Sequence, residues 1–362
     1  MSDSIDFSIS DKTFSKILTS KQKSGFNDKS WDDWFNFLLN SEKSIPQKQL
    51  LERTANNFYE KSFEDWVNNF ALNLPKIWVD ESAHALIPNK SEINSSAIII
   101  GKGPSLKKFD HLKLLSESNY QGSIICSDGI LIDVLKSGIT PEKFPNFYVV
   151  TIDPVEKIKF YYEHDLIKKF GNKITGIFST LTHPQVIEAA RKNHLKIHWL
   201  HTLFDYFESK KSFNRVSGLM VRAIKHKNGL PGIQTGGNVG TAAWFVGWQI
   251  LKCKNICLIG IDHGWDEKDS WDLITSHGFN AKSQKIERNS EIAKKLFPTI
   301  FNPDFNTYCI MDPIFQYYSN AFKEFISRAP DWVNTINSTQ GGSIFGKNIT
   351  SMNFSNFLSL KI

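Results

Sequence analysis

Three aspartates carry the side chains best suited to phosphate and metal chemistry, and each follows a short apolar run. They are Asp128, Asp153 and Asp262. Carboxylates gathered at one phosphate site contact a ribose or ligate Mg²⁺. The pattern predicts all three as metal ligands, with Asp128 and Asp262 also acting in catalysis and Asp153 also binding nucleotide. For Asp128 and Asp153 taken singly, a helix N-cap is the alternative.

A glycine-containing segment, Gly-Lys-Gly-Pro-Ser-Leu at residues 101–106, follows the first apolar run. Gly101 and Gly103 let the backbone approach a ligand, Pro104 can open a helix, and Ser105 can bond a phosphate oxygen. The segment is not the dinucleotide fingerprint, because Leu106 replaces the third glycine, and no P-loop lysine follows. It predicts a phosphate-binding turn, with a plain tight turn as the alternative.

A second glycine-rich segment precedes an apolar helical stretch and contains Thr235, Gly236, Gly237 and Asn238. Free backbone N–H groups and the helix dipole at such a position form an anion-binding nest. The segment therefore predicts a second set of phosphate contacts. Close packing of a helix against a sheet is the alternative.

Six apolar runs are expected to position these residues. They are Ala97–Ile100, Ser123–Cys126, Phe147–Ile152, Ile174–Phe178, Lys196–Leu200 and Ile256–Gly260. Unbroken apolar runs are typical of strands covered on both faces, and helical patterns lie between them at 106–117, 130–137, 156–170, 184–193 and 241–251. The alternation predicts an α/β fold with a doubly wound, mostly parallel, Rossmann-like sheet. Ligands of such sheets bind at the carboxyl ends of the strands, where the aspartates and glycines fall.

Three regions are predicted along the chain. Residues 1–90 form an N-terminal helical region, punctuated by Pro46 and Pro75, whose apolar stripe packs on the main domain. Residues 78–96 read as a linker, 91–270 as the nucleotide-binding domain, and 271–362 as a C-terminal lid or cap that returns to the core. The aromatic N-terminal region would suit a homo-oligomer or a protein partner.

Composition excludes several classes of protein. With 41% hydrophobic residues the chain is not globally disordered, and its net charge of +6, mixed with 37 acids, does not favour a nucleic-acid partner. Four cysteines make no disulfide framework. The N-terminus has no signal-peptide pattern, and the uncharged run 228–251 is interrupted by Pro231 and Gly232, so no membrane span is expected. The expected location is cytoplasmic.

The ordered set of motifs resembles the MptE-like family, which includes archaeal hydroxymethyl-dihydropterin pyrophosphokinases and flagellin-modifying motility accessory factors. The motifs are Gly101–Leu106, Asp128, the Gly138–Pro141 turn, Asp153, the 235–240 loop, Leu258–Asp262 and Asn334–Gly342. The resemblance covers about residues 95–345. It implies a transferase that moves diphosphate from ATP to a hydroxymethyl-dihydropterin, with Mg²⁺ bridging the phosphates and Trp265 or Trp271 stacking on the substrate.

The same motifs resemble bacterial sialyltransferases that use CMP-activated sugars. That resemblance implies a sialyltransferase-like fold and a histidine general base beyond the Gly-Ile-Asp strand end. His277 is the catalytic candidate by position and His263 the second choice, since imidazole has a suitable pKa. A glycosyltransferase using a CMP-activated acidic sugar, without an essential metal, is thus the alternative to diphosphate transfer. A non-catalytic nucleotide-binding or scaffold protein is the third.

Overall fold

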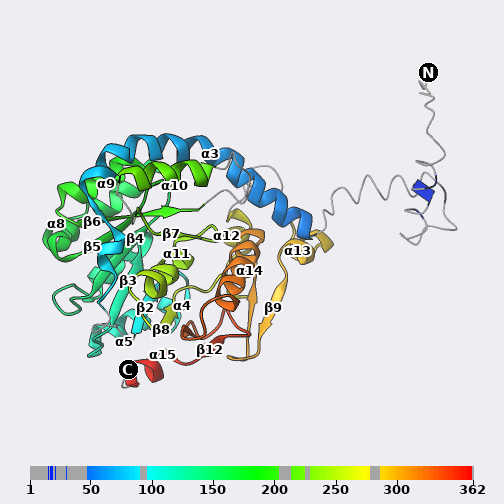
Figure 1. The fold of residues 1–362 in the computed structure, drawn as a ribbon. Helices are drawn as coiled ribbons and strands as arrows, with labels where there is room; N and C mark the ends of the chain where they lie inside the picture. Colours follow the sequence, from blue (N-terminus) through cyan, green and yellow to red (C-terminus); the bar gives the residue numbers. More distant parts are fainter. Residues whose placement is uncertain are drawn as a thin grey trace. The chain divides into compact units, whose positions relative to one another are not determined.

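All six apolar runs form strands of one parallel sheet (Figure 1). The strands are β2 (Ser96–Ile100), β3 (Ser123–Ser127), β4 (Phe147–Thr151), β5 (Thr175–Ser179), β6 (Lys196–Thr202) and β8 (Asn255–Ile259). The predicted α/β, doubly wound, Rossmann-like fold is therefore confirmed.

The structure is a computed structural model. It describes residues 47–89, 96–203, 213–224, 229–277 and 286–360, together with Ser15, Ile17, Leu18, Lys21 and Ser30. Its internal contacts divide the chain into residues 1–50 and residues 51–362. The fold and the site described below belong to the second unit.

The sheet reverses its winding direction beside β2. Its order is β1-β6-β5-β4-β3-β2-β8-β11-β12, with β7 paired to β6. Four further short strands complete it: β1 (Glu81–Ser82), β7 (Gly232–Ile233), β11 (Asn334–Asn337) and β12 (Ile349–Ser351). Because β3 lies on one side of β2 and β8 on the other, the crevice between the loops after β2 and β8 is the topological switch point, where open α/β sheets bind ligands.

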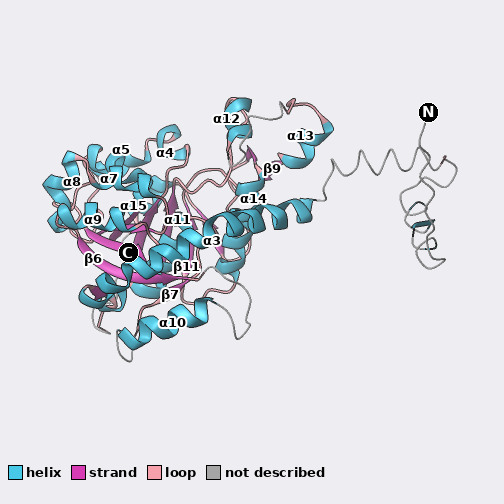
Figure 2. Ribbon diagram, turned by 90° about the horizontal axis from the view of Figure 1, so that it is seen from above, coloured by secondary structure: helices cyan, strands magenta, loops and turns pink. Residues whose placement is uncertain are grey.

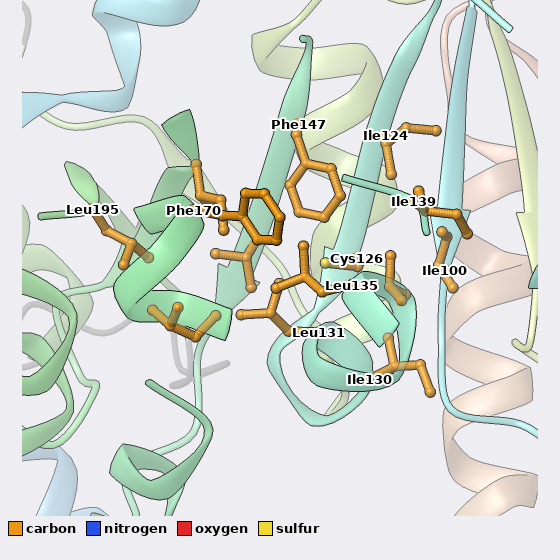
Figure 3. Packing of buried hydrophobic residues seen from close by; sticks show 14 of the residues in the cluster. Ile100, Ile124, Cys126, Ile130, Leu131, Leu135, Ile139, Phe147, Phe170 and Leu195 are labelled. Atoms are coloured by element: carbon orange, nitrogen blue, oxygen red, sulfur yellow. The ribbon is translucent and has the colours of Figure 1, made fainter. Parts of the chain in front are cut away.

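Alternate residues of the central strands face two helical layers. In β2, Ile98 and Ile100 pack in the layer of α5, α6, α8 and α9, whereas Ala97 and Ile99 pack with α11 and α14. Figure 2 shows helices on both sides of the sheet, and Figure 3 shows the first layer around Ile100, Ile124 and Phe147. Burial on both faces explains why the strand sequences are continuously apolar.

The helices of these layers follow the strands along the chain. They are α4 (Ser105–Lys108), α5 (His111–Glu117), α6 (Leu131–Lys136), α7 (Lys159–Tyr162), α8 (Asp165–Phe170), α9 (Pro184–Lys192), α10 (Phe213–Ile224) and α11 (Val239–Phe245), which continues as a π-helical turn over Val246–Ile250. The predicted helix over 156–170 is wrong as a single element. His164 is extended and its Nδ1 accepts a hydrogen bond from the Leu166 N–H, which starts α8 anew.

The N-terminal helix α3 (Gln47–Val79) packs on the sheet domain, as the stripe predicted. Its Phe70 is buried with Leu181 and with Val221 of α10. Two expectations are corrected. Pro75 lies inside α3 and does not end it, and the predicted linker contains β1 and a 3₁₀ turn, Ala83–Leu86, that join the sheet domain. Pairing of β1 with β6 offsets the weak strand propensity of its two polar residues. Pro46 lies outside the described residues.

The C-terminal region adds helices and then returns to the sheet. It contains α12 (Trp271–Ser276), α13 (Glu291–Leu296), the antiparallel pair β9 (Thr299–Asn302) and β10 (Thr307–Ile310), α14 (Pro313–Ser327) and α15 (Phe354–Ser359). Strand β11 lies between β8 and β12. The domain boundaries at residues 90 and 270 stay predictions. In the part of the chain that the structure describes, no helix has the length and apolarity needed to cross a bilayer.

Candidate functional site

Gly101 and Gly103 bring the loop after β2 into contact with the loop after β8. The Gly101 N–H donates to the Ile259 carbonyl at 2.9 Å, and the Gly103 N–H donates to the Gly260 carbonyl at 2.8 Å. A Cβ on Gly103 would lie 1.9 Å from Oδ2 of Asp262. The glycines are therefore required by the close approach of the two strand ends at the switch point.

Lys102 lies between these glycines and is exposed. Its Cδ lies 3.8 Å from where a Cβ on Gly129 would be, and its Nζ lies 6.0 Å from the centre of the Tyr161 ring. Burial raises the pKa of Asp128. The positive charge of Lys102 is one of the influences that partly offset this, after hydrogen bonds from Thr151 and Gly129. The side chain thus extends from the loop after β2 across the end of β3. Sequence reasoning assigned Lys102 no role, although it lies inside the predicted phosphate-binding segment.

Asp128 and Asp153 are brought together at the ends of β3 and β4. Asp128 is buried, and its Oδ1 accepts a hydrogen bond from the Gly129 N–H at 2.6 Å. Its Oδ2 is buried without a hydrogen-bond partner among the described residues. Burial, and next the negative charge of Asp153, raise the pKa of Asp128 to about 7. Burial also raises the pKa of Asp153, against the positive charge of Lys157.

Three tyrosines surround this acid pair, Asp128 and Asp153. Burial and then the charge of Asp128 raise the pKa of Tyr162. Burial and then the charges of Asp128 and Asp153 raise the pKa of Tyr161 on α7. Burial and then the charge of Asp153 raise the pKa of Tyr318 on α14. Tyr161 and Tyr318 were not singled out from the sequence, because both lie inside helices, where an aromatic residue is normally interpreted as packing.

Asp262 occupies a different position from the acid pair. Its Oδ2 accepts a hydrogen bond from the Ser105 hydroxyl at 2.9 Å, behind the loop that contains Gly103. Burial raises the pKa of Asp262 to about 7, and the Ser105 hydrogen bond partly offsets this. No group of three or more acidic, histidine or cysteine side chains in the described ranges could hold a metal ion. The structure therefore pairs two of the three predicted ligands and ties the third to Ser105.

The turn after β11 encloses the backbone of Asp262. The Ser343 N–H donates to the Asp262 carbonyl at 2.9 Å, and the Ser343 hydroxyl donates to the His263 carbonyl at 2.9 Å. Gly342 has φ +70°, and a Cβ there would lie 2.4 Å from the Asp262 carbonyl oxygen. The C-terminal motif thus contributes to the site by fixing the end of β8.

The second glycine segment packs against α14. Gly236 and Gly237 have φ of +54° and +85°, and a Cβ on Gly237 would lie 2.6 Å from the Tyr318 ring. Asn238 caps α11 by accepting the Thr241 N–H at 2.9 Å, while the Thr235 hydroxyl accepts the Gly237 N–H at 3.2 Å. Both glycines are thus explained by positive φ and by close packing on the helix α14, not by packing of a helix against the sheet. A phosphate contact of Thr235, Gly236, Gly237 or Asn238 stays a prediction.

The two candidate histidines differ in environment. His263 is buried, its ring lies among Phe315, Tyr318 and Phe322, and burial lowers its pKa to about 3. His277 has a side chain 34% exposed, and its Nδ1 lies 2.6 Å from Oδ2 of the fully buried Asp312. A histidine oriented by a buried carboxylate has the arrangement of a general base.

The predicted stacking tryptophans are engaged elsewhere. The Trp265 indole donates to Oδ2 of Asp312 at 2.7 Å, and the Trp271 indole donates to the Ile286 carbonyl at 2.6 Å. Both rings pack in a small cluster around Phe297 and Ile310. Stacking of either ring on a substrate stays a prediction.

Two cavities in the described part of the chain bear on where a ligand could bind. One, of about 50 Å³, is lined by Ser105, Asp262 and Gly342 among others. The other, of about 310 Å³, lies at α10 and the end of β6, next to His201 and away from the acid pair. Small-molecule sites usually span about 300–1,000 Å³, so the pocket behind Ser105 is too small for a whole nucleotide. The candidate site is the group of residues that the structure brings together at the ends of β2, β3 and β4, namely Lys102, Asp128 and Asp153.

Residues 68–268 match the family described as 6-hydroxymethylpterin diphosphokinase MptE-like, which is more than half of the chain. The chain belongs to the MptE-like family. The matched range contains Lys102, Asp128, Asp153 and Asp262, and it begins inside α3. This confirms the resemblance given by the ordered motifs.

Among solved structures, the chain is similar to the MAf glycosyltransferase from Magnetospirillum magneticum AMB-1. The TM-score is 0.51 at 14% identity, with 80% of this chain and 39% of that chain covered. The chain thus spans about two fifths of that protein, and the likeness shows a shared fold. No curated protein matches the sequence.

Proposed function

We propose that this MptE-like chain is a nucleotide-dependent transferase that moves diphosphate from ATP to a hydroxymethyl-dihydropterin. The observation that carries the proposal is the acid pair at the ends of β3 and β4, beside Lys102 of the loop that follows β2 at the switch point. The family to which the chain belongs supports the choice of reaction.

The acid pair fits the divalent ion that such a reaction uses. Mg²⁺ in nucleotide sites is held by one or two carboxylates together with substrate phosphates. Asp128 Oδ2 is a buried oxygen with no hydrogen-bond partner in the described part of the chain, and Asp153 is its charged neighbour. Both residues would hold the ion, which when bound neutralises charge on the phosphoryl oxygens.

The chain's own residues supply positioning and charge. The substrate hydroxyl oxygen attacks the β-phosphorus, the bond from that phosphorus to the α–β bridging oxygen breaks, and AMP leaves. Lys102 would neutralise phosphate charge that develops beside the loop, which is the main task in phosphoryl transfer. The hydroxyl proton is released to solvent, because Asp128 would be engaged in holding the ion; a catalytic role of Asp128 beyond that stays a prediction. Asp262 would hold Ser105 and the loop; metal ligation by Asp262 stays a prediction.

The test is thermal unfolding with ATP, AMP, CMP, CDP and CTP, each with and without Mg²⁺. A ligand at about 100 times its dissociation constant adds roughly 2.7 kcal/mol. Stabilisation by ATP only with Mg²⁺ is expected, and Asp128→Asn and Asp153→Asn should each remove the Mg²⁺-dependent part. ATP turnover that persists in EDTA would contradict diphosphate transfer.

A second candidate is sugar transfer from a CMP-activated acidic sugar, and the His277–Asp312 pair favours it. His277 would deprotonate the acceptor hydroxyl while Asp312 orients its ring. This candidate predicts stabilisation by cytidine nucleotides without metal and slow CMP release with water as acceptor. His277→Asn should then abolish CMP release but keep CMP binding. Absence of CMP binding at millimolar concentration would exclude this candidate.

A further inference from the structure

Helix α3 is hydrogen-bonded to the carboxyl ends of β4 and β5 through two buried asparagines. Asn69 Nδ2 donates to the carbonyls of Pro154 and Leu181, both at 3.0 Å. Asn73 Nδ2 donates to the carbonyls of Thr180 at 3.1 Å and Thr182 at 2.7 Å. Residues four apart share a helix face, so the two amides act side by side.

Attachment of α3 to the sheet domain does not by itself require these amide hydrogen bonds. Apolar contacts already attach the helix, since Phe70 is buried against Leu181 and Val221. Burying an amide loses free energy unless its groups are paired, and Asn73 Oδ1 has no partner among the described residues. The hydrogen bonds therefore indicate a requirement to hold the strand-end carbonyls in place.

The two asparagines hold different loops. The hydrogen bonds of Asn73 go to the loop after β5, whereas those of Asn69 join that loop to the loop after β4. Asn73 reaches β4 only at one remove, because the Thr182 hydroxyl donates to the Thr151 carbonyl at 3.1 Å. Pro154, whose carbonyl Asn69 holds, directly follows Asp153, so Asn69 is the direct link between α3 and the acid pair.

We infer that Asn69 is a positioning residue of the candidate site, which holds the backbone after Asp153 so that its carboxylate stays beside Asp128. The inference rests on the proposed function for what the acid pair binds. It makes α3, which precedes the alternating strands and helices, a part of the site. The ligand concerned is a divalent cation together with a nucleotide phosphate.

The test compares Asn69→Ala with Asn73→Ala in the full chain. Each variant loses two buried hydrogen bonds from the same helix face, so similar losses of melting temperature are expected. Amide hydrogen exchange should rise roughly tenfold at residues 155–158 in Asn69→Ala, and only around residues 180–183 in Asn73→Ala. Mutation of a residue that orients a metal ligand typically lowers metal affinity by about 10–100-fold. Electron paramagnetic resonance of Mn²⁺ in the presence of ATP should show a loss of Mn²⁺ affinity of this size for Asn69→Ala. The loss of Mn²⁺ affinity for Asn73→Ala should be about threefold at most.

The outcomes separate this inference from the proposed function. Equal changes of exchange and of Mn²⁺ affinity in the two variants would make Asn69 a stability residue only and overturn the inference. If the unmodified protein binds no Mn²⁺ and ATP, the proposed function fails, and the exchange comparison still decides whether Asn69 holds the Asp153 loop. Should Asn69→Ala not fold, Asn69→Ser keeps one donor, and the same two measurements on it, again against Asn73→Ala, decide the matter.

Discussion

At the scale of single residues, Gly103 shows how little space separates the two loops of the switch point. A Cβ at Gly103 would lie 1.9 Å from Asp262 Oδ2 and 2.8 Å from the Gly260 carbonyl oxygen. A Cβ at Gly129, on the neighbouring strand end, would meet only Lys102 Cδ at 3.8 Å. Both glycines thus follow the carboxyl end of a strand, but only Gly103 has no room for a side chain.

Gly103→Ala should therefore lower the free energy of unfolding by about 1–3 kcal/mol, as overpacking does, and weaken nucleotide binding. Gly129→Ala is the matched control and should change the free energy of unfolding by less than about 0.5 kcal/mol. Urea unfolding of both variants measures the difference. Equal stabilities would show that the loops can separate without loss.

Asp262 makes stability depend on pH. Its pKa is about 7 in the folded protein, against an ordinary value of 3.8. Between these values the folded state keeps the proton that the unfolded state has lost, so the free energy of unfolding falls as pH rises from about 4 to about 7. Asp262→Asn has no such proton, and its curve should fall less steeply over that range. Urea unfolding at a series of pH values tests this, and parallel curves for the two proteins would contradict it.

The sequence was informative for the acid pair because strand ends could be located from apolar runs. Asp128 and Asp153 were predicted together, and adjacent strands β3 and β4 place them together. The hydrogen bond of Asp262 to Ser105 could not be predicted, because it depends on how far two loops cross at the switch point. Asn69 gave no signal at all, since a polar residue on a helix is normally interpreted as solvent-exposed.

At the scale of elements, β11 and the turn after it form the support of the loop that contains Asp262. Asn337 is fully buried at the end of β11. Its Nδ2 donates to the Ile344 carbonyl at 2.6 Å, and its Oδ1 accepts the Thr339 N–H at 2.9 Å and the Thr339 hydroxyl at 2.7 Å. Three hydrogen bonds from one side chain thus shape the turn.

Asn337→Ala should lower the free energy of unfolding by about 2–3 kcal/mol, because each hydrogen bond contributes about 1 kcal/mol, and should weaken nucleotide binding. Asn334→Ala, at the other end of β11, serves as the control. It loses a partly buried hydrogen bond donated to Asn255 and an exposed one accepted from the Thr350 hydroxyl, so a loss of about 1 kcal/mol or less is expected. Denaturant titration with and without ATP and Mg²⁺ gives both quantities. Similar losses would mean that the turn is not supported by Asn337.

Strands buried on both faces could be predicted, because burial makes their sequences continuously apolar. Short strands that form only because a neighbouring strand pairs with them could not. The strands β1, β7 and β12 have two or three residues each, too few for a periodic pattern. The helix predicted over 106–117 is divided at Asp110, which has φ +50°. Pro75 did not end α3, because packing of Ile77 and the hydrogen bonds of Asn73 stabilise the helix on both sides of it.

At the scale of the whole molecule, the internal contacts place Leu51–Val79 of α3 in one unit with the sheet. Phe70 and Ile77 are buried in that unit. Each buried side chain of this size contributes about 1.5–3 kcal/mol, and each hydrogen bond of Asn69 and Asn73 about 0.5–1.5 kcal/mol. Together these are comparable with the 5–15 kcal/mol by which a typical domain is stable.

A chain lacking residues 1–90 should therefore not fold, whereas a chain lacking residues 1–50 should keep a cooperative melting transition within a few degrees of the full protein. Circular dichroism melting of the two deletions measures this. A cooperative transition in the shorter chain would show that α3 is dispensable to the sheet domain.

The order of strands in the sheet also determines the order in which strands can pair during synthesis of the chain. Strands β2 to β6 lie within residues 96–202, and each of β3 to β6 can pair with a neighbour already synthesised. The other edge of β2 must wait for β8, more than 150 residues later, and β8 must wait for β11. A growing chain therefore carries an open, apolar strand edge through much of its synthesis, which is an aggregation hazard. Strand β8 closes that edge and holds the loop that contains Lys102 through Ile259 and Gly260, so this loop gains its support only after residue 260 has been synthesised.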